Sequence, residues 1–196
     1  NDDGSRQNAF DNYPTLLTEL FNKSLLRIIF SKKYPSKRQN YDSPLEVESV
    51  IGAGMMVRRA ALEEVGFLDE EYFFFMEETD WCFRMRKAGW KIFHVPQAKV
   101  YHLKGQSKEK DPARSWIEYY RSLYLFFRKN RSLLSYLLLR IFRVFKLTLN
   151  WILTLTAFLL TLGISKSLRR KLLIYSKLLL WHLKFCPEQE GLRELS

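Results

Sequence analysis

The sequence predicts an α/β domain over residues 1–131, followed by a helical, membrane-associated tail over residues 132–196. In the first part, short strand patterns alternate with helical patterns, as is typical of mixed α/β domains. The second part is rich in Leu, Phe, Tyr and Trp, and the whole net charge of +11 comes from residues 113–196. Residues 1–112 hold 17 basic and 17 acidic residues, whereas residues 113–196 hold 15 basic and 4 acidic ones. A hydrophobic content of 47% excludes a disordered chain.

The first 65 residues predict a helix, an interrupted strand and a second helix. Residues 15–31 have helical periodicity after Pro14, with one apolar side formed by Leu16, Leu17, Leu20, Leu25 and Ile28. Residues 32–44 contain basic residues, two prolines and turn formers, and they predict a loop. Residues 46–57 predict a strand interrupted by Gly52-Ala53-Gly54, where the backbone could bend or approach a ligand. Residues 58–65 predict a short helix, with Gly66 as its left-handed C-terminal residue.

Residues 66–131 predict two further helices and two short strands. An aromatic run at residues 72–75 precedes a helix over residues 77–87, which Gly89 closes. Short strands are expected at residues 91–95 and 99–101, on either side of Pro96. Asp111 and Pro112 are a favourable N-cap and first-turn residue for a helix that continues to about residue 131.

The tail predicts a membrane-embedded or membrane-lying helical hairpin. Residues 147–164 are 18 consecutive residues without a formal charge, just enough to be considered for a span. Asn150 and four threonines weaken that candidate, and basic residues at both ends give no clear orientation. Farther on, Arg170, Lys177 and Lys184 recur every seven residues in an otherwise apolar segment, the pattern of an interfacial helix. The alternative is a soluble helical subdomain or a dimer surface.

The composition of the tail also favours one class of partner. Basic charge mixed with large apolar residues suits an anionic membrane surface better than it suits DNA, so we expect a membrane partner and no nucleic acid. The alternative, a nucleic-acid-binding protein, would show salt-sensitive binding to oligonucleotides and no preference for anionic liposomes.

Two further features bear on the setting of the chain. Cys82 and Cys186 are far apart and form no CxxC pair, so we interpret them as reduced thiols in a cytosolic setting. The sequence opens at Asn1 without a methionine or a signal peptide, and we expect it to be a fragment of a longer protein.

Three carboxylates, Glu77, Glu78 and Asp80, lie within one predicted helical turn. A structural interpretation is available, because acids near a helix N-terminus are favoured by the helix dipole and Asp80 can pair with Arg84 at i,i+4. That interpretation leaves the preceding aromatic run unexplained. A carboxylate packed against aromatic rings can have a raised pKa, which suits a general base.

The histidines and glycines are weaker signals when each is taken alone. His102 ends a strand pattern, and a lone His there is more often a structural hydrogen-bonding group; we interpret His94 and His182 in that way. Gly54 and Gly105 have turn interpretations that need no function. The pair Asp2-Asp3 is similar to a metal-binding acid pair, but no apolar strand precedes it, so a terminal turn is the better interpretation.

Taken together, residues 50–107 resemble the C-terminal half of the catalytic domain of family 2 glycosyltransferases, in particular the bacterial rhamnosyltransferase-like branch. That branch contains G-x-x-M-L-V-R-R, G-x-F-D-E-x-F-F, E-D-x-D-x-C-x-R, A-G-[WY] and V-x-H-x-x-G-x-S in this order. The matching segments here are residues 52–59, 66–74, 77–84, 88–90 and 100–107. Order, spacing and residue types agree over nearly sixty positions. Asp3-Gly4-Ser5, Pro14-Thr15 and Tyr119-Tyr120-Arg121 agree more loosely.

The resemblance implies a GT-A fold and inverting transfer from a nucleotide-sugar donor to a lipid-linked or cell-surface polysaccharide acceptor. The acid that deprotonates the acceptor hydroxyl would be Glu78, where the family has Asp, with Glu77 and Asp80 beside it. His102 would be a ligand of a divalent cation, Mg²⁺ or Mn²⁺, that holds the donor diphosphate. We also expect Gly54, Trp81, Arg84 and Ser107, which lie in the matching motifs, to bind substrate. The protein would act at the cytoplasmic face of the bacterial inner membrane.

One departure from the family limits this expectation. Such enzymes begin with an α/β nucleotide-binding half that carries a D-x-D metal motif, and the sequence contains neither. We therefore expect residues 1–131 to be the acceptor-side half of a transferase, inactive without the other half. The competing class is a non-catalytic, membrane-bound interaction module that keeps the motif but transfers nothing.

Overall fold

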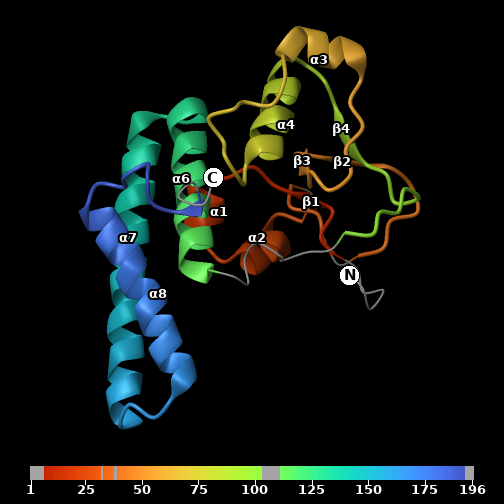
Figure 1. The fold of residues 1–196 in the computed structure, drawn as a ribbon. Coiled ribbons are helices and arrows are strands. Elements are labelled where there is room, and N and C mark those ends of the chain that lie inside the picture. The colour runs from red at the N-terminus through yellow and green to blue at the C-terminus, as the bar shows by residue number, and fades with distance from the viewer. Residues whose placement is uncertain (1–6, 32, 38, 103–110, 193–196) are drawn as a thin grey trace. The chain divides into compact units, whose positions relative to one another are not determined.

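A computed structural model describes residues 7–31, 33–37, 39–102 and 111–192. The chain forms two compact units, residues 1–104 and residues 105–196. Figure 1 shows short strands and helices in the first unit and three longer helices in the second. Among the described residues, helix is more frequent than strand.

The strands of the first unit form two small antiparallel pairs. β1 (Phe10–Asp11) pairs with β3 (Ser49–Val50), with Phe10 opposite Val50. β2 (Leu45–Val47) pairs with β4 (Ile92–His94), with Val47 opposite Ile92. Phe10, Val47 and Ile92 are buried, so the two pairs share the apolar core of this unit.

The sequence predicted one continuous helix over residues 15–31. The structure has two helices there, so the prediction of a single helix was wrong. α1 (Leu16–Leu20) begins at a capping box, in which the Thr15 side chain accepts from Thr18 N and the Thr18 hydroxyl accepts from Thr15 N. α2 (Lys23–Ile29) begins at Asn22, whose side chain accepts a hydrogen bond from Ser24 N at 2.8 Å. Asn22 therefore caps a new helix, because Asn satisfies free N–H groups better at an N-cap than inside a helix.

Two predicted strands also differ from the structure. Of residues 46–57, only the first part forms β2 and β3, and the chain turns at Gly52. Residues 99–101 form no strand, and Val100 and Tyr101 are exposed there. An apolar alternation without a neighbouring strand to pair with does not make a sheet.

The helix predictions around the motifs are confirmed. α3 (Arg59–Val65) ends at Gly66, which has φ +77° but ψ −173° and is therefore not the left-handed αL residue that we predicted. α4 (Glu77–Lys87) follows the aromatic run and packs against β3 and α3. Gly89, at φ +94°, follows its end as predicted.

The second unit is a three-helix assembly. α6 (Pro112–Asn130) begins at Asp111, which accepts hydrogen bonds from Ala113 N and Arg114 N, as the sequence predicts. α7 (Leu133–Leu160) and α8 (Lys166–Leu183) lie side by side as an antiparallel hairpin, and both pack against α6 (Figure 1). Leu139, Leu178 and Trp181 are buried between them.

The predicted helical hairpin is thus present, while its contact with a membrane and the boundary at residues 131 and 132 stay predictions. By length and composition, α7 passes as a candidate membrane-crossing helix, and 6% of its most apolar window is buried. α6 packs on α7 and α8, so truncation after residue 131 would remove the helices that cover α6.

Candidate functional site

The candidate site lies at the N-terminus of α4, where the backbone takes an unusual course. Phe75 and Met76, directly before the helix, have φ values of +69° and +66°. Neither is glycine, and a non-glycine residue in the left-handed region costs about 1–3 kcal/mol. Met76 is the N-cap residue and provides no side-chain hydrogen bond. Such strained backbone is frequent at functional sites, because it fixes the direction of the next side chains.

The next two side chains are Glu77 and Glu78, and each has a buried oxygen. Glu77 Oε2 and Glu78 Oε2 are shielded from solvent and have no hydrogen-bond partner among the described residues. Buried polar atoms are rarely unpaired in native structures, so an unpaired one needs an explanation, and a catalytic role, a bound ion and an ordered water are among the explanations. Both acids lie in the first helical turn, where the helix dipole favours negative charge.

The surroundings of the two glutamates differ. Burial raises the pKa of Glu77, a hydrogen bond with its own backbone opposes that shift, and the negative charge of Glu78 adds to it. Glu78 packs against the turn after β3, since a Cβ placed on Gly52 would lie 3.6 Å from Glu78 Cβ. That distance is an ordinary van der Waals contact, so the Glu78 side chain lies directly beside Gly52.

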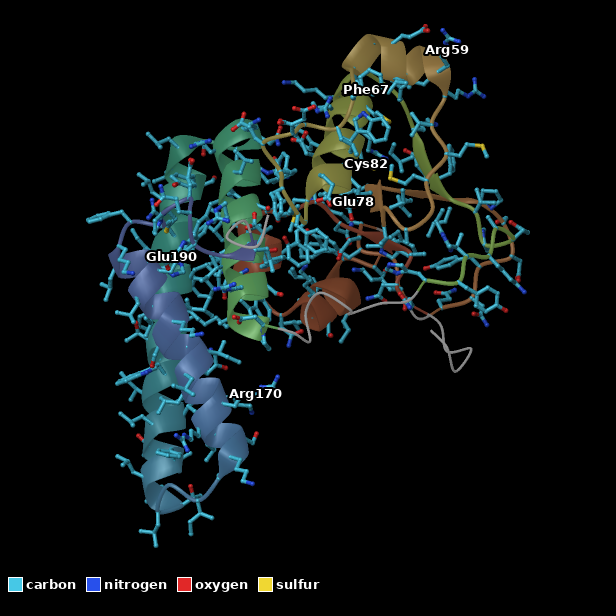
Figure 2. The ribbon with its side chains drawn as sticks, in the orientation of Figure 1. Arg59, Phe67, Glu78, Cys82, Arg170 and Glu190 are labelled. Atoms are coloured by element: carbon cyan, nitrogen blue, oxygen red, sulfur yellow. The ribbon has the colours of Figure 1, made fainter. Side chains whose placement is uncertain are left out.

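Cys82 lies one turn beyond Glu78 on the same side of α4. Figure 2 shows the two side chains on successive turns, beside β3 and the turn that follows it. The Cys82 side chain is fully buried, and burial is the main cause that raises the pKa of its thiol. The backbone of Val50 is within hydrogen-bonding reach of the sulfur. Cys82 is therefore a structural thiol that helps to hold α4 on β3.

Asp80 has a different environment from the two glutamates. It is 2% exposed, and both carboxylate oxygens have partners. Tyr72 Oη donates to Oδ1 at 3.3 Å, and Arg84 Nε donates to Oδ2 at 2.8 Å. Burial and the Asp80 charge together raise the pKa of Tyr72. The pair with Arg84 was predicted from the i,i+4 spacing, and the structure confirms it.

Trp81 and Arg84 hold the connection between α3 and α4. Trp81 Nε1 donates to Gly66 O at 2.8 Å, and Arg84 donates to Val65 O at 2.6 Å and to Phe67 O at 2.8 Å. Three consecutive carbonyls at the end of α3 are thus satisfied by two side chains of α4. Sequence reasoning missed this role, although the i,i+3 spacing of Trp81 and Arg84 places them on one helix face. The predicted contact of either residue with substrate stays a prediction.

The other predicted site residues are distant from the glutamates in sequence, and no contact between them and the glutamates is found among the described residues. Gly54 approaches Val100 so closely that a Cβ at residue 54 would lie 2.8 Å from Val100 Cγ2. His102 is exposed; its Nδ1 lies 3.2 Å from Gln7 Oε1, and its carbonyl accepts from Gln7 Nε2 at 2.7 Å. Ser107, Gly105 and the Asp2-Asp3 pair lie outside the described residues.

The described residues do not fit a complete metal site. Across residues 7–31, 33–37, 39–102 and 111–192, no three His, Cys, Asp or Glu side chains converge as a metal would require. A divalent cation needs several oxygen or nitrogen ligands, and His102 could provide one. No chemical step is therefore assigned to a metal here.

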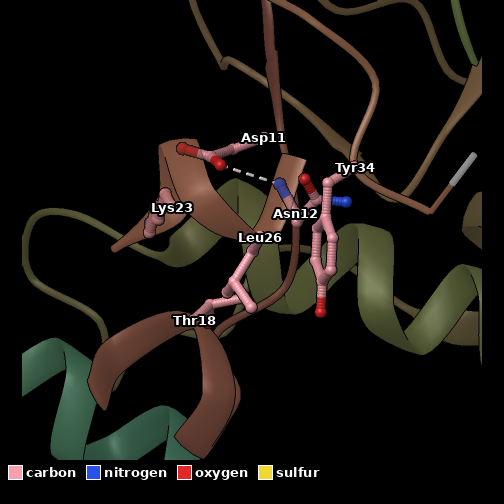
Figure 3. A pocket seen from close by; sticks show the side chains of 6 residues that line it. All are labelled: Asp11, Asn12, Thr18, Lys23, Leu26 and Tyr34. Carbon is pink, nitrogen blue, oxygen red and sulfur yellow. Dashed lines mark hydrogen bonds between the residues drawn. The ribbon is translucent and has the colours of Figure 1, made fainter. Parts of the chain in front are cut away.

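A small cavity in the first unit is distinct from this site. Figure 3 shows its lining residues, which are Asp11, Asn12, Thr18, Lys23, Leu26 and Tyr34. Its volume is about 10 Å³, which is room for at most one water molecule. None of the predicted site residues lines it, and a sugar or a nucleotide does not fit.

The chain falls in a family of sugar-transferring enzymes. The chain belongs to the glycosyl transferase family group 2, whose model matches residues 9–186. Because this family has a GT-A-like α/β fold, membership also confirms the predicted fold class at that level.

Similar proteins confirm the rhamnosyltransferase-like branch. Two Mycobacterium tuberculosis proteins, from strains CDC 1551 / Oshkosh and ATCC 25618 / H37Rv, are each named N-acetylglucosaminyl-diphospho-decaprenol L-rhamnosyltransferase. Each is 41% identical over 81 residues, which cover 41% of this chain and 26% of the relative. A dTDP-rhamnosyl transferase RfbF of Shigella flexneri is 31% identical over 96 residues, covering 45% of this chain and 32% of the relative. The aligned part thus spans between a quarter and a third of these relatives. No solved structure matches the chain.

Proposed function

We propose that this chain forms the acceptor-side part of an inverting glycosyltransferase, which moves a sugar from a nucleotide-diphosphate sugar to a lipid-linked or glycan acceptor. The observation that carries the proposal is the pair of buried oxygens, Glu77 Oε2 and Glu78 Oε2, without a partner among the described residues. A buried carboxylate oxygen that no protein donor occupies is available to accept a proton from an incoming hydroxyl.

In the proposed reaction Glu78 is the general base. Its carboxylate takes the proton of the acceptor hydroxyl, and the hydroxyl oxygen forms a bond to the anomeric carbon of the donor. The bond between that carbon and the diphosphate oxygen breaks at the same time, and the nucleoside diphosphate leaves with the bonding electron pair. The acceptor oxygen and the departing diphosphate oxygen are on opposite faces of the sugar, so the configuration at the anomeric carbon inverts.

The remaining side chains of the motif keep Glu78 in place. The left-handed residues Phe75 and Met76 set the direction of the first turn of α4. Asp80, Trp81 and Arg84 fix the helix against the end of α3 through the hydrogen bonds described above. Catalytic geometry depends on such supporting contacts, because small displacements of a general base cost rate.

The names of the similar proteins support rhamnose as the sugar and a lipid-linked diphosphate as the acceptor. A lipid-linked acceptor has to be met at a bilayer, so we place the reaction at the cytoplasmic face of the bacterial inner membrane, in the synthesis of cell-envelope polysaccharide. The proposal includes no nucleic-acid partner.

Family 2 glycosyltransferases commonly use a divalent metal, and we include Mg²⁺ or Mn²⁺ as the ion that binds the donor diphosphate. His102 is the candidate ligand within the described residues, so further ligands have to come from elsewhere. The proton transfer to Glu78 does not depend on that assignment.

The proposal is tested by a transfer assay on the whole reading frame that encodes this chain. The donor is dTDP-rhamnose and the acceptor is N-acetylglucosaminyl-diphospho-decaprenol. We expect Glu78→Gln to keep nucleotide binding and to lower turnover by about a hundredfold or more, as loss of a general base does. Glu63→Gln is the matched control, because Glu63 is an exposed acid on α3.

Three outcomes would change the proposal. Near-normal turnover of Glu78→Gln would reject Glu78 as the base. An equal loss in Glu77→Gln alone would assign the base to Glu77, which has the raised pKa. Nucleotide binding without transfer by the unmodified protein would favour a non-catalytic interaction module.

A further inference from the structure

The surface of α7 that faces away from its neighbouring helices is mostly apolar, although the exposed Thr148 and Thr156 also lie on it. Its apolar residues, which we call the α7 stripe, recur at intervals of three, four or seven positions and therefore lie on one helix face. All are between 44% and 67% exposed: Leu134, Leu138, Ile141, Phe145, Leu149, Ile152 and Leu159. The opposite face of α7 contains the buried Leu139 and Leu147. A helix that is apolar on both faces needs a second apolar environment besides its own core.

Two of the three cations of α7 point away from the stripe, and the third, Lys146, is exposed beside it. Arg140 lies over the rings of Tyr124 and Tyr136, and Arg143 lies over the ring of Tyr120. Tyr120 and Tyr124 belong to α6, so both guanidinium groups point toward the packed side of α7. The stripe thus continues without a charge past these two positions, although the sequence around them is basic.

The positive charge of the three-helix unit indicates which partner covers the α7 stripe. Residues 119–187 contain 13 Lys and Arg and no Asp or Glu. On α8, Lys166, Arg170, Lys177 and Lys184 are exposed, and Figure 2 shows Arg170 pointing away from the hairpin. A second copy of the chain would bring the same cations together, whereas the negative surface of an anionic bilayer attracts them. Charge complementarity therefore favours anionic lipid.

Although α7 as a whole has the length and composition of a candidate membrane-crossing helix, its uncharged part is shorter than the bilayer core and its partner α8 is highly charged. The uncharged part of α7 runs from residue 147 to its end at residue 160, which is about 21 Å at 1.5 Å per residue. The hydrocarbon core is about 30 Å thick. If the hairpin crossed the bilayer, α8 would carry Lys166, Arg169, Arg170, Lys171 and Lys177 into or next to that core alongside α7, and cations inside the hydrocarbon are unfavourable.

We infer that α7 lies in the plane of an anionic membrane surface, with the α7 stripe immersed in one leaflet and the cations of the unit at the headgroups. The stripe extends from residue 134 to residue 159, about 38 Å along the helix, which suits a contact parallel to the membrane. This inference rests on the membrane partnership of the proposed function and specifies its geometry. Vesicle binding needs no sugar donor, so its failure is distinguishable from a failure of transfer.

Flotation with vesicles tests the surface. The full chain is mixed with phosphatidylcholine vesicles that contain or lack 30% phosphatidylglycerol. We expect binding to the anionic vesicles, and a loss of about tenfold or more when Ile141, Phe145 and Ile152 are replaced together by Ser, because large apolar side chains leave the lipid. The control is Ile28→Ser, Ile29→Ser and Met56→Ser, which removes three exposed apolar side chains of the first unit and should change binding little.

Depth measurements test the orientation without relying on that variant. Spin labels are attached to single cysteines at positions 138, 145 and 152 in a Cys186→Ser background. We expect the three labels to lie at similar depth in one leaflet. A depth that changes steadily through the bilayer midplane would overturn the inference in favour of a span. Unchanged vesicle binding by the stripe variant would also overturn it, and if that variant dissociated a dimer, the stripe would be an interface between copies.

Discussion

Arg84 donates a hydrogen bond to the buried carboxylate of Asp80 at 2.8 Å, one turn apart on α4, while its other nitrogens hold two carbonyls at the end of α3. The ion pair therefore connects the motif helix to the helix before it. An exposed pair of the same spacing and length, Arg59 with Glu63 on α3, provides a direct comparison, because the two pairs differ in burial and in additional partners.

We expect Asp80→Ala to lower the free energy of unfolding by about 3 kcal/mol, because it leaves a partly buried guanidinium and a buried tyrosine hydroxyl without their partner. Glu63→Ala should lower it by about 0.5 kcal/mol or less, as is usual for an exposed pair. Urea unfolding of both variants measures the difference. Equal losses would show that Asp80 contributes no more than a surface carboxylate.

Glu77→Gln is expected to stabilise the protein at neutral pH. Burial raises the pKa of Glu77 in the folded state, so the folded state binds the proton more tightly than the unfolded state. The stability that this provides is complete below the unfolded pKa, and it is lost as the pH rises through the folded pKa. Urea midpoints of the two proteins should therefore be similar near pH 4 and should diverge in favour of the variant by pH 7. A variant less stable than the parent at pH 7 would contradict this origin of the shift.

His102→Ala tests the proposed cation ligand. We expect the variant, in the whole protein, to bind the nucleotide donor more weakly and to need more Mn²⁺ for half-maximal donor binding, since an ion bridging protein and diphosphate loses one ligand. Equilibrium binding at several Mn²⁺ concentrations measures both effects. Gln7→Ala is the control that removes the side-chain contact of His102 but keeps the imidazole. Unchanged Mn²⁺ dependence would leave His102 with a structural role.

The second unit should lose stability at acidic pH through His182. This side chain is buried; its Nδ1 lies 2.7 Å from Leu178 O, and Nε2 lies 2.8 Å from Tyr124 Oη. Burial is the main cause that lowers its pKa, and the charge of Arg140 adds to it. The neutral ring stabilises the fold above the unfolded pKa, and this contribution is lost as the pH falls through that pKa toward the folded one. The fall in thermal stability between pH 7 and pH 5 should be smaller in His182→Gln, and equal falls would exclude His182 as the cause.

The sequence predicted the elements whose ends carry local signals. Asp111-Pro112 starts α6 and the aromatic run precedes α4, because caps and periodicity act over a few residues. The helix breaks at Asn22 because Asn22 caps a second helix. Residues 99–101 form no strand, because no neighbouring strand among the described residues pairs with them. Periodicity alone does not contain that information.

The sequence identified the acidic residues of the candidate site, but it did not predict that their environments differ. The acidic motif indicated Glu77, Glu78 and Asp80 together. Within the part of the chain that the structure describes, each glutamate has one buried oxygen without a hydrogen-bond partner, whereas Asp80 has two donors. The roles of Trp81 and Arg84 as partners of three carbonyls depend on where α3 ends in space. The left-handed backbone at Phe75 and Met76 has no signal in the sequence, because glycine is absent there.

The two free thiols of the chain fall one in each compact unit, Cys82 in the first and Cys186 in the second. Cys82 is fully shielded against β3 beside Glu78, so an alkylating reagent reaches it when α4 lifts away from the strand. Its labelling rate would then report the population of that opened state. Cys186 is half-buried, and its labelling rate would report separately on the three-helix unit. Pulsed alkylation measured by mass spectrometry would therefore follow both units in one sample through the two native thiols, with no cysteine introduced.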